Sequence, residues 1–336
     1  MRVLVIKTSS LGDVVHTLPA LTDAAAYFPD IEFDWVVEAG FSQVPSWHAR
    51  VNRVIPVALR RWRKHPLQAR QTGEWAEFKR DIGAVKYDAV IDAQGLLKSA
   101  WLSRYSRGER YGLDKYSARE PLASRFYHHP ISVPKGQHAV ERTRQLFAAA
   151  LGYSVPESLG EYQIDRARLP DNAHTGDYLL FCHGTTWPTK HWPEDYWLEL
   201  TTKLASSGLR VLLPWGSEIE RLRAEKIAAA GTYVEVLPRS SLSELASIIA
   251  DAKAVVSVDT GLAHLTAALA VPNITLYGPT DPKLVGSYGA HQLHLQARNY
   301  AAAAGRHVEP AVFTGLTPEI VLRQLNDILG QQVVSS

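Results

Sequence analysis

The hydrophobic positions of this chain fall into short runs of Val, Ile and Leu that alternate with longer amphipathic stretches. Such runs are typical of parallel strands buried on both faces, and the stretches between them of connecting helices. Strands are expected at residues 3–6, 33–37, 54–57, 89–91, 178–181, 210–213, 233–236, 254–258 and 273–277. Helices are expected at residues 18–27, 75–82, 139–151, 195–206, 219–230, 242–250 and 318–329, the last with Thr317 as its N-cap. The pattern predicts an α/β protein made of two doubly wound halves.

The alternation stops near the middle of the chain, in the polar stretch DRARLPDNAHTGD at residues 165–177. A second strand and helix series begins directly after it, so this stretch is the expected boundary. We therefore expect an N-terminal domain over residues 1–165, a linker over 166–177 and a C-terminal domain over 178–314. The segment 315–336 is expected to form a C-terminal helix that packs back on the N-terminal domain. Because doubly wound sheets bind ligands at the carboxyl ends of their strands, we expect the active site in a cleft between the two halves.

The composition is that of a soluble globular protein. Hydrophobic residues make up 46% and charged residues 21% of the chain, and 36 Lys and Arg against 34 Asp and Glu give a net charge of +2. This balance argues against a general nucleic-acid-binding protein. The single cysteine, Cys182, excludes an intramolecular disulfide and suits a reducing compartment. The first apolar run is too short for a signal peptide, and no run approaches the roughly 18 residues of a spanning helix, so we expect a cytoplasmic protein.

Asp13 is the first candidate for chemistry. It follows the first expected strand in the stretch Lys7-Thr8-Ser9-Ser10-Leu11-Gly12-Asp13, where Gly12 would permit a tight turn into a helix. A carboxylate at this strand end could accept a proton from a bound hydroxyl. It could equally cap the helix, and a helix N-terminus weakens a carboxylate as a base. The pattern leaves both roles open.

Two strand ends in the second half carry groups suited to phosphate binding. The stretch Asp259-Thr260-Gly261 would begin a helix, and the N–H groups at a helix start bind phosphate oxygens. The hydroxyls of Thr185 and Thr186 and the amine of Lys190 could hold a second phosphate oxygen. Both patterns are also typical of a capped helix or a solvated loop.

Glu220 follows Trp215-Gly216-Ser217 and could accept hydrogen bonds from ribose hydroxyls. It could equally be an exposed glutamate in the first turn of a helix, which the pattern favours.

No paired-histidine or multi-cysteine metal motif is present in the sequence, and His16, His138 and His264 are more typical of packing residues.

The run Arg60-Arg61-Trp62-Arg63-Lys64-His65 is the densest basic stretch of the chain. Such a run is usually a solvated face. With Trp62 and Trp75 nearby, it could instead contact an anionic amphiphile at a membrane surface.

Together these stretches resemble one family. The motifs are K-T-S-S-L-G-D at 7–13, W-V-V-E at 35–38, R-R-W-R-K at 60–64, D-A-Q-G-L-L-K-S at 92–99, A-R-E-P-L-A-S at 118–124, H-W-P at 191–193, V-D-T-G-L-A-H at 258–264 and Y-G-P-T-D-P at 277–282. In this order they resemble the lipopolysaccharide heptosyltransferases of glycosyltransferase family 9, and the resemblance covers nearly the whole chain.

The resemblance implies the GT-B fold, two Rossmann-like domains facing a central cleft. It implies an inverting transfer of L-glycero-D-manno-heptose from ADP-heptose to the first Kdo (3-deoxy-D-manno-octulosonic acid) residue of Kdo2-lipid A. It also implies that no metal is required and that the enzyme works at the cytoplasmic face of the bacterial inner membrane.

The resemblance also assigns residues, and it makes Asp13 the general base. The expected donor-binding residues, in the C-terminal half, are Thr185, Thr186, Lys190, Glu220, Asp259, Thr260, Gly261, Leu262, Ala263 and His264. The expected acceptor-binding residues, in the N-terminal half, are Ser10, Gly12, Arg60, Arg61, Arg63, Lys64, Arg119 and His138.

Other functions fit parts of the same pattern. An enzyme that transfers heptose to an existing heptose would differ from an enzyme that transfers it to Kdo mainly in the acceptor. A sugar-nucleotide epimerase or hydrolase could use the same scaffold but would have no need of the basic run. A binding module without catalysis would leave Asp13 without a role.

Overall fold

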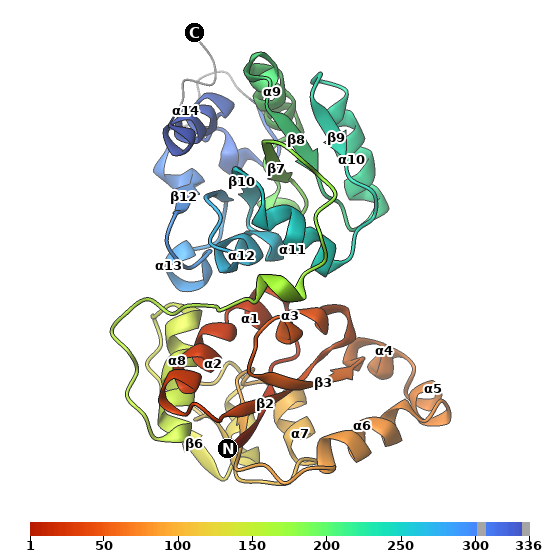
Figure 1. Cartoon of the computed structure of the whole chain (residues 1–336), viewed down its shortest axis with the longest axis vertical. Helices are drawn as coiled ribbons and strands as arrows, with labels where there is room; N and C mark the ends of the chain where they lie inside the picture. The colour runs from red at the N-terminus through yellow and green to blue at the C-terminus, as the bar shows by residue number, and fades with distance from the viewer. Residues whose placement is uncertain (301–306, 331–336) are drawn as a thin grey trace. The chain divides into compact units, whose positions relative to one another are not determined.

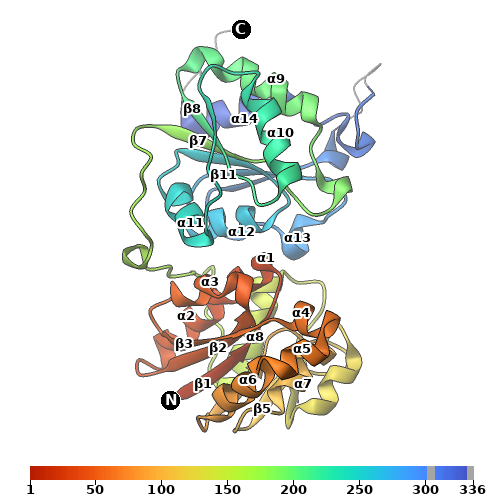
Figure 2. The ribbon, with the colours of Figure 1, turned by 90° about the vertical axis from the view of Figure 1, so that its right-hand side faces the viewer.

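The structure, a computed structural model, describes residues 1–300 and 307–330. It divides into two compact units, Met1–Arg168 and Leu169–Ser336, and the division falls inside the segment expected as the linker. Each unit contains one six-stranded sheet with helices on both faces (Figures 1 and 2).

The first sheet has the strand order β3-β2-β1-β4-β5-β6, and every neighbouring pair is parallel. Its strands are β1 (Arg2–Ile6), β2 (Glu32–Glu38), β3 (Val51–Val57), β4 (Ala89–Asp92), β5 (Arg110–Leu113) and β6 (His129–Ile131). Its α-helices are α1 (Leu11–Val15), α2 (Leu18–Tyr27), α3 (Gln43–Ser46), α4 (Leu59–Lys64), α5 (Pro66–Gln71), α6 (Glu74–Gly83), α7 (Leu97–Ser103) and α8 (Ala139–Leu151). Short 3-10 helices are η1 (Ala39–Phe41), η2 (Pro121–Phe126) and η3 (Arg166–Arg168).

The first core lies on both faces of the central strands. Residues 3–6 of β1 are fully buried, as expected for a strand between two helix layers. On one face Leu4 and Ile6 pack with Phe78 and Ile82 of α6. The other face is covered by α2 and α8, which contact each other.

The second sheet has the order β12-β11-β10-β7-β8-β9 and is also parallel throughout. Its strands are β7 (Tyr178–Cys182), β8 (Arg210–Leu213), β9 (Val234–Val236), β10 (Ala254–Val258), β11 (Asn273–Tyr277) and β12 (Gln292–Gln296). Its α-helices are α9 (Glu194–Leu204), α10 (Glu218–Ala228), α11 (Leu242–Ala250), α12 (Gly261–Ala268), α13 (Pro282–Val285) and α14 (Pro318–Leu329). Its 3-10 helices are η4 (Pro188–Lys190), η5 (Ala205–Ser207), η6 (Ala297–Asn299) and η7 (Ala311–Phe313).

Helix α14 belongs to the core of the second unit. Val321 and Leu325 are fully buried there and cluster with Leu316 and Trp197. The helix contacts α9, β10 and β11. The apolar stripe of α14 is thus covered within its own unit, and the packing of this helix on the N-terminal domain stays an expectation. Residues 331–336 of that expected segment lie outside the described residues.

The sequence pattern finds the strands that form apolar runs, the edge strands β3 and β9 included, and misses three others. All the expected strands are present, whereas β5, β6 and β12 were not expected. Strands β6 and β12 are sheet edges, so their residues, HPI and QLHLQ, are polar or half-exposed and make no apolar run. Within residues 1–300 and 307–330, no helix has the length and apolar character needed to cross a bilayer.

Candidate active site

Each sheet has one point where its connections diverge to opposite sides. In the first sheet this point lies between β1 and β4, and in the second between β7 and β10. Loops that leave such a pair of strands open a crevice at the carboxyl edge of the sheet, where ligands bind. The candidate residues therefore form two groups, one on each unit.

Asp13 lies in the first turn of α1, directly after β1. Its Oδ2 accepts hydrogen bonds from the backbone N–H and the hydroxyl of Ser10, both at 2.8 Å. Its Oδ1 lies 3.6 Å from Lys7 Nζ, and the side chain is 45% exposed. One oxygen thus caps the helix and the other lies near a cation, on a side chain that is partly exposed, so the two roles left open by the sequence are compatible. Gly12 is buried inside α1, so the chain turns before it, at residues 8–10.

Gln94, in the loop after β4, holds the loop that precedes Asp13. Its Oε1 accepts the N–H groups of Thr8 at 2.8 Å and Ser9 at 3.2 Å, and its Nε2 donates to Ser9 O at 2.6 Å. Lys98 of α7 reaches the same loop, with its Nζ 3.4 Å from Ser9 Oγ. These contacts fix the backbone that presents Asp13.

The β4 loop is itself anchored by a buried carboxylate. Asp92 is fully buried and accepts hydrogen bonds from Gln94 N at 2.9 Å and Tyr127 Oη at 2.7 Å. Burial raises the pKa of Asp92, while these hydrogen bonds oppose the rise. Gly112 makes room for Tyr127, since a Cβ at that position would lie 2.4 Å from the Tyr127 ring.

The basic run forms helix α4, and the structure separates its members. Arg60, Arg63 and Lys64 are exposed. Arg61 is exposed as well, but its guanidinium forms a bidentate ion pair with Glu74, at 2.9 and 2.8 Å, and is therefore less available to an acceptor than its neighbours. Hydrogen bonds from Arg61 and Trp62 lower the pKa of Glu74.

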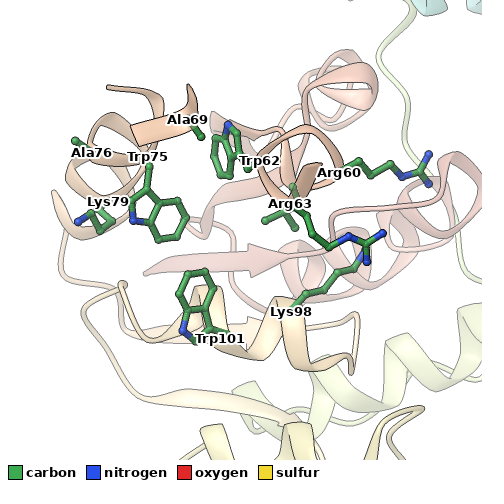
Figure 3. A pocket seen from close by; sticks show the side chains of 10 residues that line it. Arg60, Trp62, Arg63, Ala69, Trp75, Ala76, Lys79, Lys98 and Trp101 are labelled. Atoms are coloured by element: carbon green, nitrogen blue, oxygen red, sulfur yellow. The ribbon is translucent and has the colours of Figure 1, made fainter. Parts of the chain in front are cut away.

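A pocket of about 910 Å³ lies beside α4 (Figure 3). We call it the tryptophan pocket; it is lined by Leu59, Arg60, Trp62, Arg63, Ala69, Trp75, Ala76, Lys79, Lys98 and Trp101. Of the candidate acceptor residues, Arg60 and Arg63 are therefore brought together with Lys98, which connects them to the loop before Asp13.

The two remaining acceptor candidates lie on other loops of the first unit. Arg119 is exposed and precedes Glu120, whose N–H donates to Gly95 O at 3.2 Å, so it lies next to the β4 loop. His138 is the N-cap of α8, and its Nδ1 accepts the N–H of Val140 at 3.2 Å. Its ring meets that of His16 edge to face at 5.2 Å, so the packing role expected for these histidines is present.

Lys190 and Asp259 pair across the centre of the second sheet. Lys190 Nζ lies 2.6 Å from Asp259 Oδ2, with the lysine side chain 21% and the aspartate 7% exposed. Thr185 Oγ1 donates to the backbone oxygen of Asp259 at 3.1 Å, while Thr186 is exposed. The loops after β7 and β10 are thus tied together at the point where the sheet opens.

Helix α12 begins beside this ion pair, with Thr260 as its N-cap. Among the described residues no side-chain hydrogen bond caps it, which leaves N–H groups at its start available to bind an anion. Thr260, Gly261 and Leu262 are half-buried, whereas Ala263 and His264 are buried in the first turns.

Glu220 caps α10 with its carboxylate. Its Oε2 accepts the N–H groups of Gly216 at 2.8 Å and Ser217 at 3.0 Å, which confirms the structural role that the sequence favoured. Gly184, after β7, makes this position possible, since a Cβ there would lie 2.6 Å from Glu220 Oε1. The carboxylate therefore reaches the edge of the crevice, and its Oε1 can still accept a hydroxyl.

Two histidines, one buried and one half-buried, support the β7 loop. His183 is fully buried, and burial, with Arg223 and His191 nearby, lowers its pKa to about 3. His191 hydrogen-bonds Arg223 through Nδ1, and burial lowers its pKa as well. Trp192 is a packing residue, fully buried with its Nε1 donating to Leu316 O at 2.9 Å.

Gln94 and Lys98 are the residues that sequence reasoning missed, although both belong to the stretch D-A-Q-G-L-L-K-S. The signal was available, since this stretch follows the strand expected at residues 89–91. Among the described residues, no group of three or more His, Cys, Asp or Glu side chains is placed to hold a metal ion.

The chain is similar to known proteins in sequence and in structure. The family model Glycosyltransferase family 9 (heptosyltransferase) matches residues 75–311. The chain is 53% identical to lipopolysaccharide heptosyltransferase 1 of Pseudomonas aeruginosa, over 98% of both chains. It is similar in structure to E. coli heptosyltransferase WaaC with ADP, with a TM-score of 0.89 and 52% identity over 98% of this chain and 100% of that one. For WaaC with ADP-2-deoxy-2-fluoro heptose the TM-score is 0.86, with 52% identity over 97% and 99% of the chains.

Proposed function

The chain belongs to glycosyltransferase family 9, the heptosyltransferases, and from this premise we propose its reaction. It is a glycosyltransferase, and its two parallel six-stranded sheets are those of the GT-B fold. The proposed reaction moves L-glycero-D-manno-heptose from ADP-heptose to the first Kdo residue of Kdo2-lipid A, with inversion. The observation that carries it is the 53% sequence identity to a lipopolysaccharide heptosyltransferase 1 over 98% of both chains.

The proposed donor site is the crevice of the second sheet. The diphosphate of ADP-heptose would lie at the start of α12, within reach of Lys190 and the hydroxyls of Thr185 and Thr186. A lysine amine has three donors, so Lys190 can keep its contact with Asp259 while it binds a phosphate oxygen. Glu220 would accept a ribose hydroxyl, and residues 259–264 would hold the heptose.

Asp13 is the proposed general base. The acceptor hydroxyl oxygen attacks the anomeric carbon of the heptose from the face opposite the diphosphate. The bond from that carbon to the diphosphate oxygen breaks, its electron pair leaves with ADP, and the hydroxyl proton passes to Asp13. Asp13 suits this role because it follows β1 directly and its side chain is 45% exposed.

The departing ADP carries the charge that develops in the transition state. Lys190 and the start of α12 would stabilise it from fixed positions, which costs no reorganisation during the reaction. We therefore propose that the transfer needs no divalent metal.

The acceptor is a lipid, so the proposed enzyme works at the cytoplasmic face of the inner membrane without spanning it. Exposed Arg60, Arg63 and Lys64 would bind the acceptor's carboxylate and phosphate groups. Near an anionic surface, each would add roughly 1 kcal/mol of attraction, weakened by salt.

The test is product analysis with purified protein, ADP-heptose and de-acylated Kdo2-lipid A. The proposal predicts an acceptor heavier by one heptosyl group, with the anomeric configuration opposite to that of the donor by NMR. A parallel reaction uses an acceptor that already carries this heptose. Exclusive transfer to that second acceptor would overturn the proposed specificity, and a retained configuration would overturn the mechanism.

A further inference from the structure

The tryptophan pocket combines an aromatic wall with a set of cations. Its aromatic members are Trp62, Trp75 and Trp101, and its cations are Arg60, Arg63, Lys79 and Lys98. None of the ten described residues that line the pocket is acidic. A volume of about 910 Å³ is that of a binding cavity rather than a packing defect.

The aromatic wall is open to solvent at Trp101, whereas Trp62 and Trp75 are half-buried. Trp75 and Trp101 stack at 5.0 Å and 6° between ring planes, and Trp62 meets Trp75 edge to face at 5.5 Å. Trp101 is 40% exposed, and on the helices around the pocket Leu67 is 75% and Leu97 39% exposed. This apolar surface therefore extends beyond the pocket itself, which is unfavourable in water and marks a contact surface.

The cations lie at both ends of the aromatic wall. Figure 3 shows the side chains of Arg60, Arg63 and Lys98 at one end and Lys79 beside Trp75 at the other. Lys79 Nζ lies 5.9 Å from the centre of the Trp75 ring. Indole rings flanked by lysine and arginine are the arrangement by which proteins bind the boundary between lipid headgroups and acyl chains.

We propose that the tryptophan pocket docks this unit on the membrane by taking up an acyl chain of an anionic bilayer phospholipid. The phosphate of that lipid would lie beside Lys79, at the end of the aromatic wall opposite to the arginines that would bind the acceptor. The acceptor's own acyl chains fit less well as the occupant, because the exposed apolar surface extends past the pocket onto α5 and α7. The inference deepens the membrane contact of the proposed function and rests on it.

The experiment measures binding of the full-length protein to phosphatidylcholine vesicles with and without phosphatidylglycerol. Trp101→Ala is expected to lower the partition coefficient for the anionic vesicles about tenfold, since one indole leaves the interface. Trp187→Ala is the matched control, because it removes a tryptophan that is 64% exposed on the other unit. This control should bind the vesicles as the wild type does.

A second measurement needs no variant. Phosphatidylglycerol with brominated acyl chains should quench the wild-type tryptophan fluorescence, and Trp101→Ala should show less quenching. Absence of quenching in the wild type overturns the proposed binding of an acyl chain in the pocket, and this result does not depend on how well the variant folds.

The remaining outcomes separate the pocket from the proposed function. Equal, salt-sensitive vesicle binding by wild type and Trp101→Ala would overturn docking through the pocket while leaving charge attraction intact. Trp101→Ala could bind vesicles as the wild type does but have a higher KM for the acylated acceptor and an unchanged KM for the de-acylated one. That result would assign the pocket to the acceptor and would also overturn this inference. Failure of heptose transfer with vesicle binding and quenching as expected would overturn the proposed reaction alone.

Discussion

Replacing Lys190 by methionine separates the stabilisation of the leaving group from the stability of the fold. The change keeps the length of the side chain and removes its charge. If Lys190 binds the departing diphosphate, kcat should fall by about 10²- to 10³-fold, which is about 3–4 kcal/mol of transition-state stabilisation.

The same change also removes the cation that pairs with the Asp259 carboxylate. Lys190 Nζ lies 2.6 Å from its carboxylate, which is only 7% exposed. Removing one partner of a buried pair costs about 3–5 kcal/mol, and because Lys190 is 21% exposed we expect about 2–3 kcal/mol of lost stability.

Two further variants distinguish these effects. Lys190→Met with Asp259→Asn should recover most of the lost stability, because no buried charge is left unpaired, but its kcat should stay low. Asp259→Asn alone keeps the cation and should lose much less kcat than the double variant. The assay is initial-rate kinetics with both substrates saturating, together with thermal unfolding of each variant. If the double variant recovers wild-type kcat along with its stability, Lys190 is a structural residue and the reasoning is refuted.

Three other changes test separate parts of the account. Asp13→Asn keeps an oxygen for the helix cap, so stability should change by less than about 1 kcal/mol while kcat falls at least about 10²-fold; unchanged kcat, or loss of ADP-heptose binding by calorimetry, would contradict the role of base. Gly184→Ala pushes a Cβ to 2.6 Å from Glu220 Oε1, so the KM for ADP-heptose should rise several-fold with kcat less affected, and an unchanged KM would remove Glu220 from the donor site. Burial lowers the pKa of His48 to about 4 in the folded protein. As the pH falls below about 6.5, His48 therefore takes up a proton in the unfolded chain before it does so in the folded protein. Between pH 7 and pH 5 this should lower the free energy of unfolding by about 2 kcal/mol, a loss that His48→Gln should lack in denaturant titrations; equal pH dependence of the two proteins would disprove it.

The sequence predicts the central parts of the fold because burial on both faces leaves a strong pattern. The strand at residues 254–258 and the helices at 18–27 and 139–151 have the bounds expected for them. Helices such as α1 and α4 are too short to show a period, and edge strands such as β6 are too polar. Their positions depend on the sheet they join, which the local sequence does not encode.

The candidate site shows the same division. Strand ends point to Asp13 and Asp259 because doubly wound sheets collect ligands there. The contact between Lys190 and Asp259 depends on β7 and β10 being neighbours in the sheet. The loops that follow these strands are far apart in the sequence, since 74 residues separate Thr185 from Asp259, which also contact each other. The neutralisation of Arg61 by Glu74 could not be predicted either, because a basic run looks uniform until its neighbours are placed.

The most direct test of the central claim is ADP release from ADP-heptose by the purified protein, with and without de-acylated Kdo2-lipid A, in the presence of EDTA. The account predicts release that depends on the acceptor and is undiminished by the chelator. Release without acceptor would contradict a transferase and indicate a hydrolase, and loss of release in EDTA would contradict the proposed stabilisation of the leaving group by Lys190 and α12.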